Sequence, residues 1–108
     1  MASDIRITVA VERVLAAMLT DADADHYGLE LMKLTGLASG SLYPILLRLR
    51  KAGWVEARWE EIDPVAEGRP PRRYYRLTPE GVRNATRATA KRESRPARTE
   101  TKLARVAW

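Results

Sequence analysis

Four arginines fall within the segment RPPRRYYR, and their guanidinium groups are the side chains of this sequence best suited to bind a ligand. They are Arg69, Arg72, Arg73 and Arg76. A guanidinium group presents a planar fork of N–H donors that fits phosphate oxygens, and it is also attracted into a narrow minor groove of DNA. The prolines beside them stiffen the chain. The cluster therefore predicts contact with a polyanion.

The second half of this segment has the pattern of a β-strand, which divides its side chains between two faces. Alternation places Arg72, Tyr74 and Arg76 on one face, and Arg73, Tyr75 and Leu77 on the other. We therefore expect that not every arginine meets the polyanion, and that at least one tyrosine packs in the core. As an alternative, Arg72 or Arg73 forms an ion pair across a hairpin, which would add little stability on an exposed surface. The acidic candidates are Glu60, Glu61 and Asp63.

The positive charge of the chain is concentrated toward its C-terminal end. Residues 1–68 hold seven basic and eleven acidic side chains, whereas residues 69–108 hold twelve basic and three acidic ones. The net charge is +5 and the sequence pI is near 10.0. This asymmetry produces a local positive field of the kind that attracts a phosphate backbone. A solvated, partly disordered basic tail is the alternative explanation of the same charges.

The composition lacks most of the side chains that enzymes use for catalysis or metal binding. The 108 residues contain no cysteine and a single histidine, His26, so we expect no disulfide, no thiolate zinc site and no His-based catalysis. Glu60 and Glu61 are sequence neighbours on opposite strand faces, so they do not form a simple catalytic carboxylate pair. We predict that the protein is not an enzyme and that it has no metal and no cofactor.

Length and hydropathy predict one small domain in the cytoplasm. No apolar run approaches the roughly 18 residues that a membrane span needs, and the N-terminal segment lacks the basic-then-apolar order of a signal peptide. Hydrophobic residues make up 45% of the chain with no phenylalanine. The core must therefore be built from Leu, Val, Ile and Ala around a few Trp and Tyr.

Apolar spacing and turn residues predict four helices and one hairpin. Helices are expected over residues 8–19, over 27–35, from 39 or 41 to 52, and from 79 onward. The segments WVEARWEEI and RRYYRL predict the two strands of a hairpin with a long tip. This order is a winged helix-turn-helix of the α+β class, mainly α, with a three-helix core, a two-stranded β-wing and a C-terminal helix.

The third helix is expected to bury one side and to present the other to DNA. Its buried residues are Leu42, Ile45, Leu46 and Leu49, and its solvent-facing residues are Ser39, Ser41, Tyr43, Pro44, Leu47, Arg48 and Lys51. Short hydroxyls and Gly40 at its start permit close approach of a backbone, and the helix N-terminus attracts phosphate oxygens through its unpaired N–H groups. Tyr43 either reaches a phosphate or base edge, or packs against the second helix.

The position of Pro44 depends on where this helix starts. If Ser41 is the N-cap, Pro44 falls in the first turn and costs little. If Ser39 is the N-cap, Pro44 lies further inside and a local distortion follows. The sequence leaves both starts open.

Three segments, YGLEL, SGSLYPILLRL and RRYYRLTPEG, occur in an order and spacing that resemble the PadR family of bacterial transcriptional regulators, in its short form. The resemblance extends from about Val11 to about Arg87. It implies a winged helix that represses promoters by binding inverted repeats in double-stranded DNA. It also implies that Tyr27, Ser39, Ser41, Tyr43 and Pro44 lie where the family meets DNA, with Arg72 and Arg73 on its wing. The residue patterns add Gly40, Arg48, Lys51 and Arg69 to this predicted DNA-binding set.

The resemblance also implies a homodimer formed by the C-terminal helix, often together with the first helix. It assigns Val11, Val82 and Ala85 to the dimer contact. The expected organisation is a winged-helix domain over residues 1–78, a dimerising helix over 79–92 and a basic tail over 93–108, broken at Pro96. Family members usually carry a long apolar helix there, whereas this chain is rich in Arg and Thr. Some short members bind flat aromatic effectors beside a tryptophan of the last helix, but Trp108 lies beyond the break, and we assign no effector site.

Two functions compete for this sequence. The first is a dimeric DNA-binding regulator, as argued above. The second is a winged helix used as a protein-interaction adaptor without an operator of its own, in which the surfaces around Trp54, Trp59 and Trp108 bind the partner.

Overall fold

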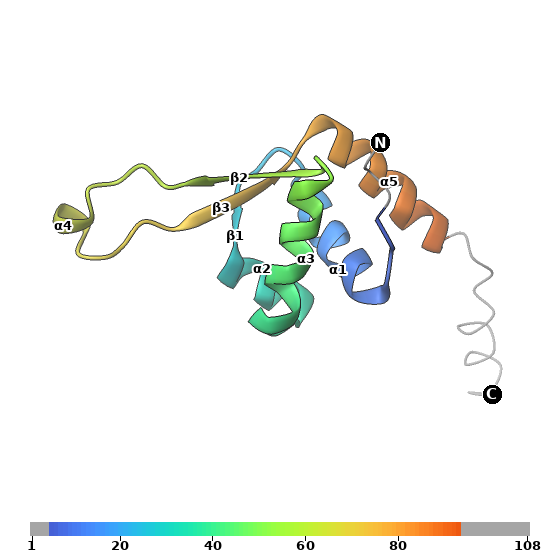
Figure 1. Cartoon of the computed structure of the whole chain (residues 1–108), viewed down its shortest axis with the longest axis horizontal. Coiled ribbons are helices and arrows are strands. Elements are labelled where there is room, and N and C mark those ends of the chain that lie inside the picture. The colour runs from blue at the N-terminus through green and yellow to red at the C-terminus, as the bar shows by residue number, and fades with distance from the viewer. Residues whose placement is uncertain (1–4, 94–108) are drawn as a thin grey trace.

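The computed structural model describes residues 5–93, and its elements follow the predicted order (Figure 1). They are α1 (Val9–Leu19), β1 (His26–Tyr27), α2 (Gly28–Thr35), α3 (Ser39–Lys51), β2 (Val55–Trp59), α4 (Pro64–Glu67), β3 (Arg73–Leu77) and α5 (Pro79–Glu93). The winged helix-turn-helix is confirmed: α2 and α3 follow α1, and β2 and β3 form the hairpin that we call the wing, residues 55–77. The predicted tail beyond residue 93 lies outside the described residues.

The core lies between the helices and the inner face of the sheet. Its fully buried side chains come mainly from the apolar stripes of α1, α2 and α3, and they include Val14, Leu15, Met18, Leu31, Leu42, Leu46 and Leu49. The predicted buried side of α3 is therefore confirmed. Tyr75 and Leu77 of β3 also face this core, with 8% and 4% exposed surface, so the prediction that one tyrosine is a core residue is correct.

The sheet has three antiparallel strands in the order β1-β3-β2, one more than we predicted. In the added pairing, His26 lies opposite Tyr75 and Tyr27 opposite Tyr74. A strand of two residues is too short to show alternation in a sequence, which is why β1 was missed. Its consequence for the site is direct, because it holds Tyr27 and the start of α2 against the base of the wing.

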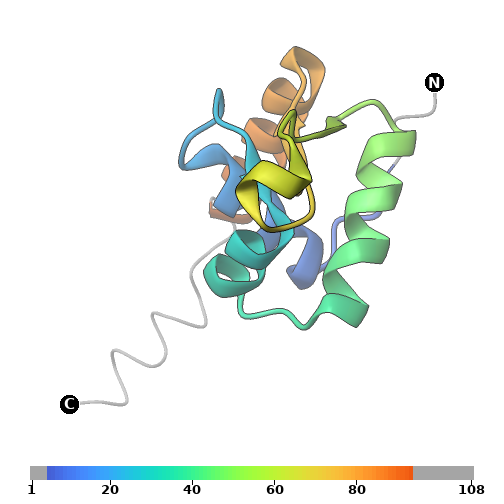
Figure 2. The ribbon, with the colours of Figure 1, turned by 90° about the vertical axis from the view of Figure 1, so that its left-hand side faces the viewer.

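The tip of the wing contains a short helix, α4, where we predicted only a loop. Asp63 caps it, since its side chain accepts a 3.0 Å hydrogen bond from the Val65 amide, and Pro64 occupies the first helical position. This cap-then-proline pattern is the same as the one that correctly predicted α5 at Thr78-Pro79. In the view along the wing (Figure 2), α4 lies in front of the core helices, so the tip projects away from the body.

Helix α3 starts earlier than either predicted cap. Ala38 is its N-cap and Ser39 is already its first residue, so neither Ser39 nor Ser41 caps it. Pro44 lies inside the helix, where it removes the backbone donor that would bond to the Gly40 carbonyl. Both residues are on the exposed side of α3, so water can replace the missing bond and the helix continues to Lys51.

Two residues that we assigned to a dimer contact are core residues of this chain. Val11 is 1% exposed and Ala85 is fully buried, because α5 packs along α1 within the same molecule. Neither can contact a second subunit in this conformation. Val82 is only partly buried and packs at the edge of the same core, so it is the one residue of the three that keeps an exposed surface.

Candidate nucleic-acid interface

The side of α3 that faces away from the core combines small, apolar and basic side chains. With about 100° between successive residues, the positions opposite the buried stripe are Gly40, Pro44, Leu47 and Lys51. Ser41 and Arg48 lie on one flank of this face, and Ser39, Tyr43 and Arg50 on the other. All of these residues are exposed, including Arg50, which we did not predict. The predicted α3 residues therefore share one accessible surface.

Gly40 is the one glycine whose presence the fold does not explain. Of the six glycines, Gly36, Gly53 and Gly68 have positive φ values, while a Cβ on Gly28 or Gly81 would lie within 2 Å of Tyr43 or Trp54 atoms. Gly40 has a helical backbone, and no atom of the chain beyond its own helical turn lies within 4 Å of where its Cβ would be. Since glycine weakens a helix relative to alanine, the open space suits the close approach of something outside the chain.

The N-termini of α2 and α3 lack the side-chain caps that the other helices have. Thr8, Asp63 and Thr78 each accept a backbone N–H at the starts of α1, α4 and α5. The N-caps of α2 and α3 are Tyr27 and Ala38, and neither makes a side-chain capping bond. The first N–H groups of these two helices therefore remain available to an external acceptor, and the helix dipole favours an anion there.

Two arginines of the wing are held by one carboxylate. Asp25, in the loop before β1, forms ion pairs with Arg58 of β2 and with Arg76 of β3, the second at 3.0 Å. Partial burial raises the pKa of Asp25, but the hydrogen bonds from the two arginines outweigh it and bring that pKa below its usual value. The carboxylate therefore stays charged and ties the wing to the body of the domain.

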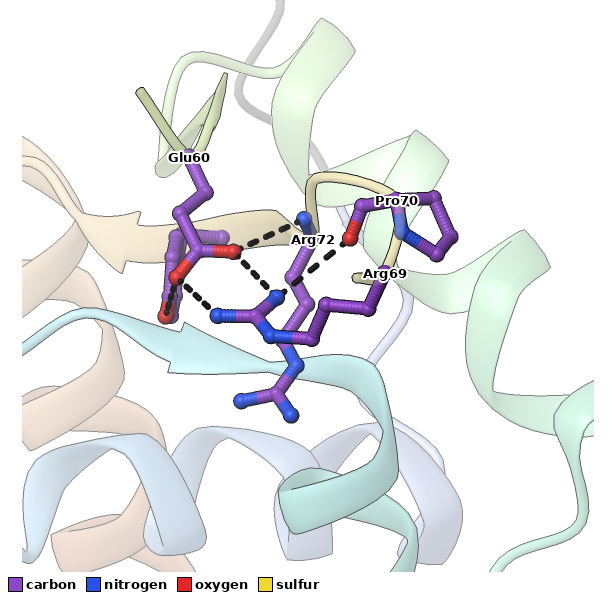
Figure 3. Close-up of polar contacts among 5 residues, drawn as sticks. Glu60, Arg69, Pro70 and Arg72 are labelled. Carbon is purple, nitrogen blue, oxygen red and sulfur yellow. Dashed lines mark hydrogen bonds and ion pairs between the residues drawn. The ribbon is translucent and has the colours of Figure 1, made fainter. Parts of the chain in front are cut away.

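A third arginine, Arg69, is paired with Glu60 rather than free (Figure 3). Its guanidinium makes a two-pronged contact with the carboxylate, with Nη1 donating to Oε1 at 2.7 Å and Nη2 to Oε2 at 3.0 Å. The pair forms because Gly68 reverses the chain after α4 and returns Arg69 beside the end of β2. We predicted that Arg69 binds DNA, and we gave an ion pair of Arg72 or Arg73 across the hairpin as an alternative to their contact with DNA. Arg69 makes the ion pair with Glu60 instead, so a DNA contact by Arg69 would require this pair to break.

The remaining wing arginines, Arg72 and Arg73, lie over aromatic rings. The Arg72 guanidinium carbon is 5.0 Å from the centre of the Tyr27 ring, and that of Arg73 is 5.0 Å from the centre of the Trp59 ring. Among the described side chains, those of residues 5–90, neither guanidinium has a carboxylate partner. An aromatic face attracts a cation without neutralising its charge, so both groups keep their positive charge while their positions are restrained.

These features meet at one open hollow of about 260 Å³, which we call the wing-base hollow. Its lining residues are Tyr27, Gly28, Leu29, Tyr43, Arg72 and Arg73. Although strand alternation predicted opposite faces for the two arginines, both border this hollow, because Arg72 precedes the first residue of β3. The hollow thus joins the start of α2, the flank of α3 and the base of the wing.

Tyr43 packs against α2, one of the two roles that we considered for it, and also keeps an exposed surface. Its ring packs beside the backbone of Gly28, where an added Cβ would be 1.9 Å from the tyrosine oxygen. At the same time 42% of the residue is exposed, and it lines the wing-base hollow. The packing against α2 therefore restrains the ring while part of the residue stays at the accessible surface.

Sequence reasoning missed the contribution of acidic residues to this surface. Asp25 and Glu60 hold three wing arginines, which leaves two free of carboxylates. The strand register carries no signal for the Glu60–Arg69 pair, because Trp59 lies opposite Arg73 and continuing the register places Glu60 opposite Arg72. Across residues 5–93 no group of three or more His, Cys, Asp or Glu side chains is placed to hold a metal ion, and no helix is long and apolar enough to cross a membrane.

Comparison with known proteins identifies the family of the chain. Residues 15–87 match the Transcriptional regulator PadR-like family. A PadR family transcriptional regulator from Eggerthella lenta is 26% identical, with a TM-score of 0.59 and 74% and 70% of the two chains covered.

Two further structures, at 22% identity, show the same fold. A PadR-like transcriptional regulator from Bacillus cereus has a TM-score of 0.61 and covers 92% of this chain and 91% of its own. Wild-type MarR from E. coli, in its apo form, also has a TM-score of 0.61, with 94% and 76% covered. No curated protein sequence matches this chain. The family match covers most of the winged helix and confirms the resemblance that the three sequence segments indicated. Members of this family are DNA-binding regulators and not enzymes. The chain belongs to the PadR-like family of transcriptional regulators.

Proposed function

We propose that this chain is a sequence-specific repressor that contacts double-stranded DNA with the exposed face of α3 and with the wing-base hollow. The observation that carries the proposal is the contrast among the five wing arginines. Arg58, Arg69 and Arg76 are paired with carboxylates, whereas Arg72 and Arg73 line the hollow without one among the described residues. A guanidinium whose charge is not already satisfied is the group that gains most from a phosphate.

The hollow has the composition of a phosphate-binding site. Arg72 and Arg73 supply positive charge, and the hydroxyls of Tyr27 and Tyr43 supply further donors. The uncapped start of α2 adds free backbone N–H groups beside Gly28. Contacts of this kind position a protein on the duplex without reading its sequence.

Sequence recognition in this proposal comes from α3, which enters the major groove. Its first turn is small, with Ser39, Gly40 and Ser41, so its backbone can come close to the DNA. Further along the same face, Leu47 is 45% exposed and offers an apolar contact of the kind that thymine methyl groups accept. Arg48 and Lys51 supply charge for guanine edges or phosphates.

The charge of the wing limits the DNA contact to its base. The tip carries exposed Glu61, Asp63 and Glu67 around α4, and these carboxylates repel phosphates. Among the described residues, the wing arginines without a carboxylate partner, Arg72 and Arg73, lie at the start of β3, where the wing passes α2. Recognition by the base of the wing therefore fits the charges better than insertion of the tip into a groove.

The repressor acts in the cytoplasm as a homodimer on an inverted repeat, because a two-fold protein presents two identical α3 faces to two half-sites. The second subunit meets α1 and α5 through their outer surfaces rather than through Val11 and Ala85. Val9, which is 52% exposed, and the partly exposed Val82 supply apolar contacts for that surface. No effector is assigned.

The adaptor hypothesis has less support from the tryptophans than the sequence alone gave it. Trp54 is 5% exposed and belongs to the core, and Trp108 lies outside the described residues. Trp59 is 59% exposed, but Arg73 covers one face of its ring. A single half-covered tryptophan makes a weak centre for a protein interface.

Mobility-shift titration of the purified protein on the DNA upstream of its own gene, at two salt concentrations, tests the proposal. We expect a discrete complex that weakens steeply with salt, together with a dimer mass for the free protein. A protein that ignores this DNA but retains a protein partner would support the adaptor, and a monomer that binds DNA would remove the two-fold model.

A further inference from the structure

Glu60 occupies the centre of a complete hydrogen-bond network at the base of the wing (Figure 3). Oε1 accepts from Arg69 Nη1 at 2.7 Å and from the Arg72 amide at 3.2 Å, and Oε2 accepts from Arg69 Nη2 at 3.0 Å and from the Tyr74 hydroxyl at 3.3 Å. A carboxylate has about four acceptor positions, so its capacity is filled. Only 16% of the side chain is exposed.

Two residues that donate single hydrogen bonds to Glu60, Arg72 and Tyr74, also contact Tyr27 of the wing-base hollow. The Arg72 amide donates a hydrogen bond to Glu60, and the Arg72 guanidinium lies over the Tyr27 ring. The Tyr74 hydroxyl also donates to Glu60, and the Tyr74 ring packs edge-on against the same Tyr27 ring, with the ring centres 5.7 Å apart. The Glu60 amide also donates to the Arg72 carbonyl at 2.7 Å, so residue 72 is held on both of its backbone polar groups.

The ion pair of Glu60 with Arg69 neutralises a positive charge of the arginine cluster. Arg69 lies in the same cluster of arginines but is satisfied by the carboxylate in a two-pronged pair, and its Nη1 also donates to the Pro70 carbonyl at 3.3 Å. A DNA phosphate would have to displace a bonded carboxylate to reach it. The network therefore orients Arg72 and keeps the guanidinium of Arg69 bound to a carboxylate.

We propose that Glu60 is a positioning residue for DNA recognition: it fixes Arg72 over Tyr27 at the wing-base hollow and withholds Arg69 from the DNA. This inference rests on the proposed function and adds to it that Arg72 contacts DNA while Arg69 stays paired with Glu60. The hydrogen bonds of the network, first of all those from Arg69, lower the pKa of the Glu60 carboxyl from 4.5 to about 2, so the network persists throughout the neutral and mildly acidic range.

Binding of a fluorescently labelled mixed-sequence duplex and of a duplex from upstream of the gene, each measured over a series of salt concentrations, tests the proposal. The test variant is Glu60→Ala, and the matched control is Glu61→Ala. Both remove one carboxylate from the same stretch of the wing, but Glu61 is exposed and takes no part in the network. Any difference between them therefore isolates positioning from the general gain in positive charge.

We expect Glu60→Ala to weaken binding about tenfold relative to Glu61→Ala and to flatten the salt slope by about one, and we expect the same flattening for Arg72→Ala. Adding Arg72→Ala to Glu60→Ala should then cost little more, because both changes remove the same contact. Glu60→Gln, which retains one acceptor oxygen, should fall between Glu60→Ala and the wild type.

Two results would overturn the proposal. Equal binding by Glu60→Ala and Glu61→Ala would show that Glu60 positions nothing. Tighter binding by Glu60→Ala than by Glu61→Ala, with a steeper salt slope that Arg69→Ala abolishes, would show that Glu60 only withholds Arg69 and does not position Arg72, which overturns the positioning role. If the wild type binds neither duplex, the proposed function fails, and hydrogen exchange of the Arg72 amide judges the positioning alone: faster exchange in Glu60→Ala than in Glu61→Ala supports it, and equal exchange refutes it.

Discussion

Replacing Gly40 by alanine separates the stability of the free protein from its affinity for DNA. Gly40 lies in the first turn of α3, its backbone is helical, and the space where a Cβ would sit is open. Alanine is favoured over glycine in a helix by about 0.5–1 kcal/mol, and the terminal position places Gly40 near the lower value. A gain of about 0.5 kcal/mol corresponds to a rise in Tm of roughly 2–4 °C for a domain of this size.

The added methyl group has the opposite effect on DNA binding in our account. If the first turn of α3 lies against the duplex, the methyl group enters a filled interface, where overpacking costs about 1–3 kcal/mol, or roughly 5- to 150-fold in Kd. Thermal unfolding followed by far-UV circular dichroism gives the first quantity, and fluorescence anisotropy with the upstream duplex gives the second. Gly40→Ser, which adds a larger side chain, should bind still more weakly.

Each half of this prediction has its own refutation. A Gly40→Ala protein that unfolds at a lower temperature than the wild type would show that the fold itself requires glycine at this position. A protein with a raised Tm and unchanged affinity would show that the first turn of α3 does not approach DNA.

Three further predictions concern the fold that supports the interface. Gly81→Ala should destabilise the protein by about 1–3 kcal/mol or more in denaturant unfolding, because the new Cβ would lie 1.8 Å from the Trp54 carbonyl oxygen, and a near-normal midpoint would contradict this packing. Thr78→Ala should cost about 1 kcal/mol by the same assay, since the Thr78 hydroxyl accepts the Gly81 amide at 2.9 Å and donates to the Gly53 carbonyl at 2.6 Å; a loss near zero would mean that the cap contributes nothing. The carboxylate of Glu60 has a pKa of about 2 in the folded protein against 4.5 ordinarily, so its contribution to stability is complete above pH 4.5 and is lost as the pH falls toward 2. The decline in stability over that pH window should be smaller in Glu60→Gln than in the wild type, and identical declines would refute the ion pair of Glu60 with Arg69.

Most of the fold could be predicted from the sequence because its helices carry long apolar stripes. The stripes of α1 and α3 each extend over about three turns, and the spacing alone identified their buried sides. Strand β1 could not be predicted, since two residues carry no period. Helix α4 was missed even though Asp63-Pro64 carries the same signal as Thr78-Pro79, because the surrounding turn residues dominated the interpretation.

The candidate site was predictable in its residue types but not in its pairings. The exposed face of α3 follows from helical periodicity, and every α3 residue of the predicted set lies on an exposed surface. The state of each arginine depends instead on where the tip returns the chain. Gly68 brings Arg69 beside Glu60, a contact that strand alternation does not describe. Likewise, the burial of Ala85 depends on how α5 packs on α1, which no local pattern determines.

The central claim, that DNA meets the base of the wing through Arg72 and Arg73, is tested most directly by the salt dependence of binding in two double variants. Arg72→Ala with Arg73→Ala removes two positive charges from the wing-base hollow. Arg58→Ala with Arg87→Ala removes two positive charges from outside it, one of them paired with Asp25. Binding of the upstream duplex is measured for both and for the wild type over the same salt series. We predict that the first variant loses affinity and that its salt slope flattens by about two, whereas the second keeps the wild-type slope. Equal slopes for the wild type and the Arg72 and Arg73 variant would contradict the account.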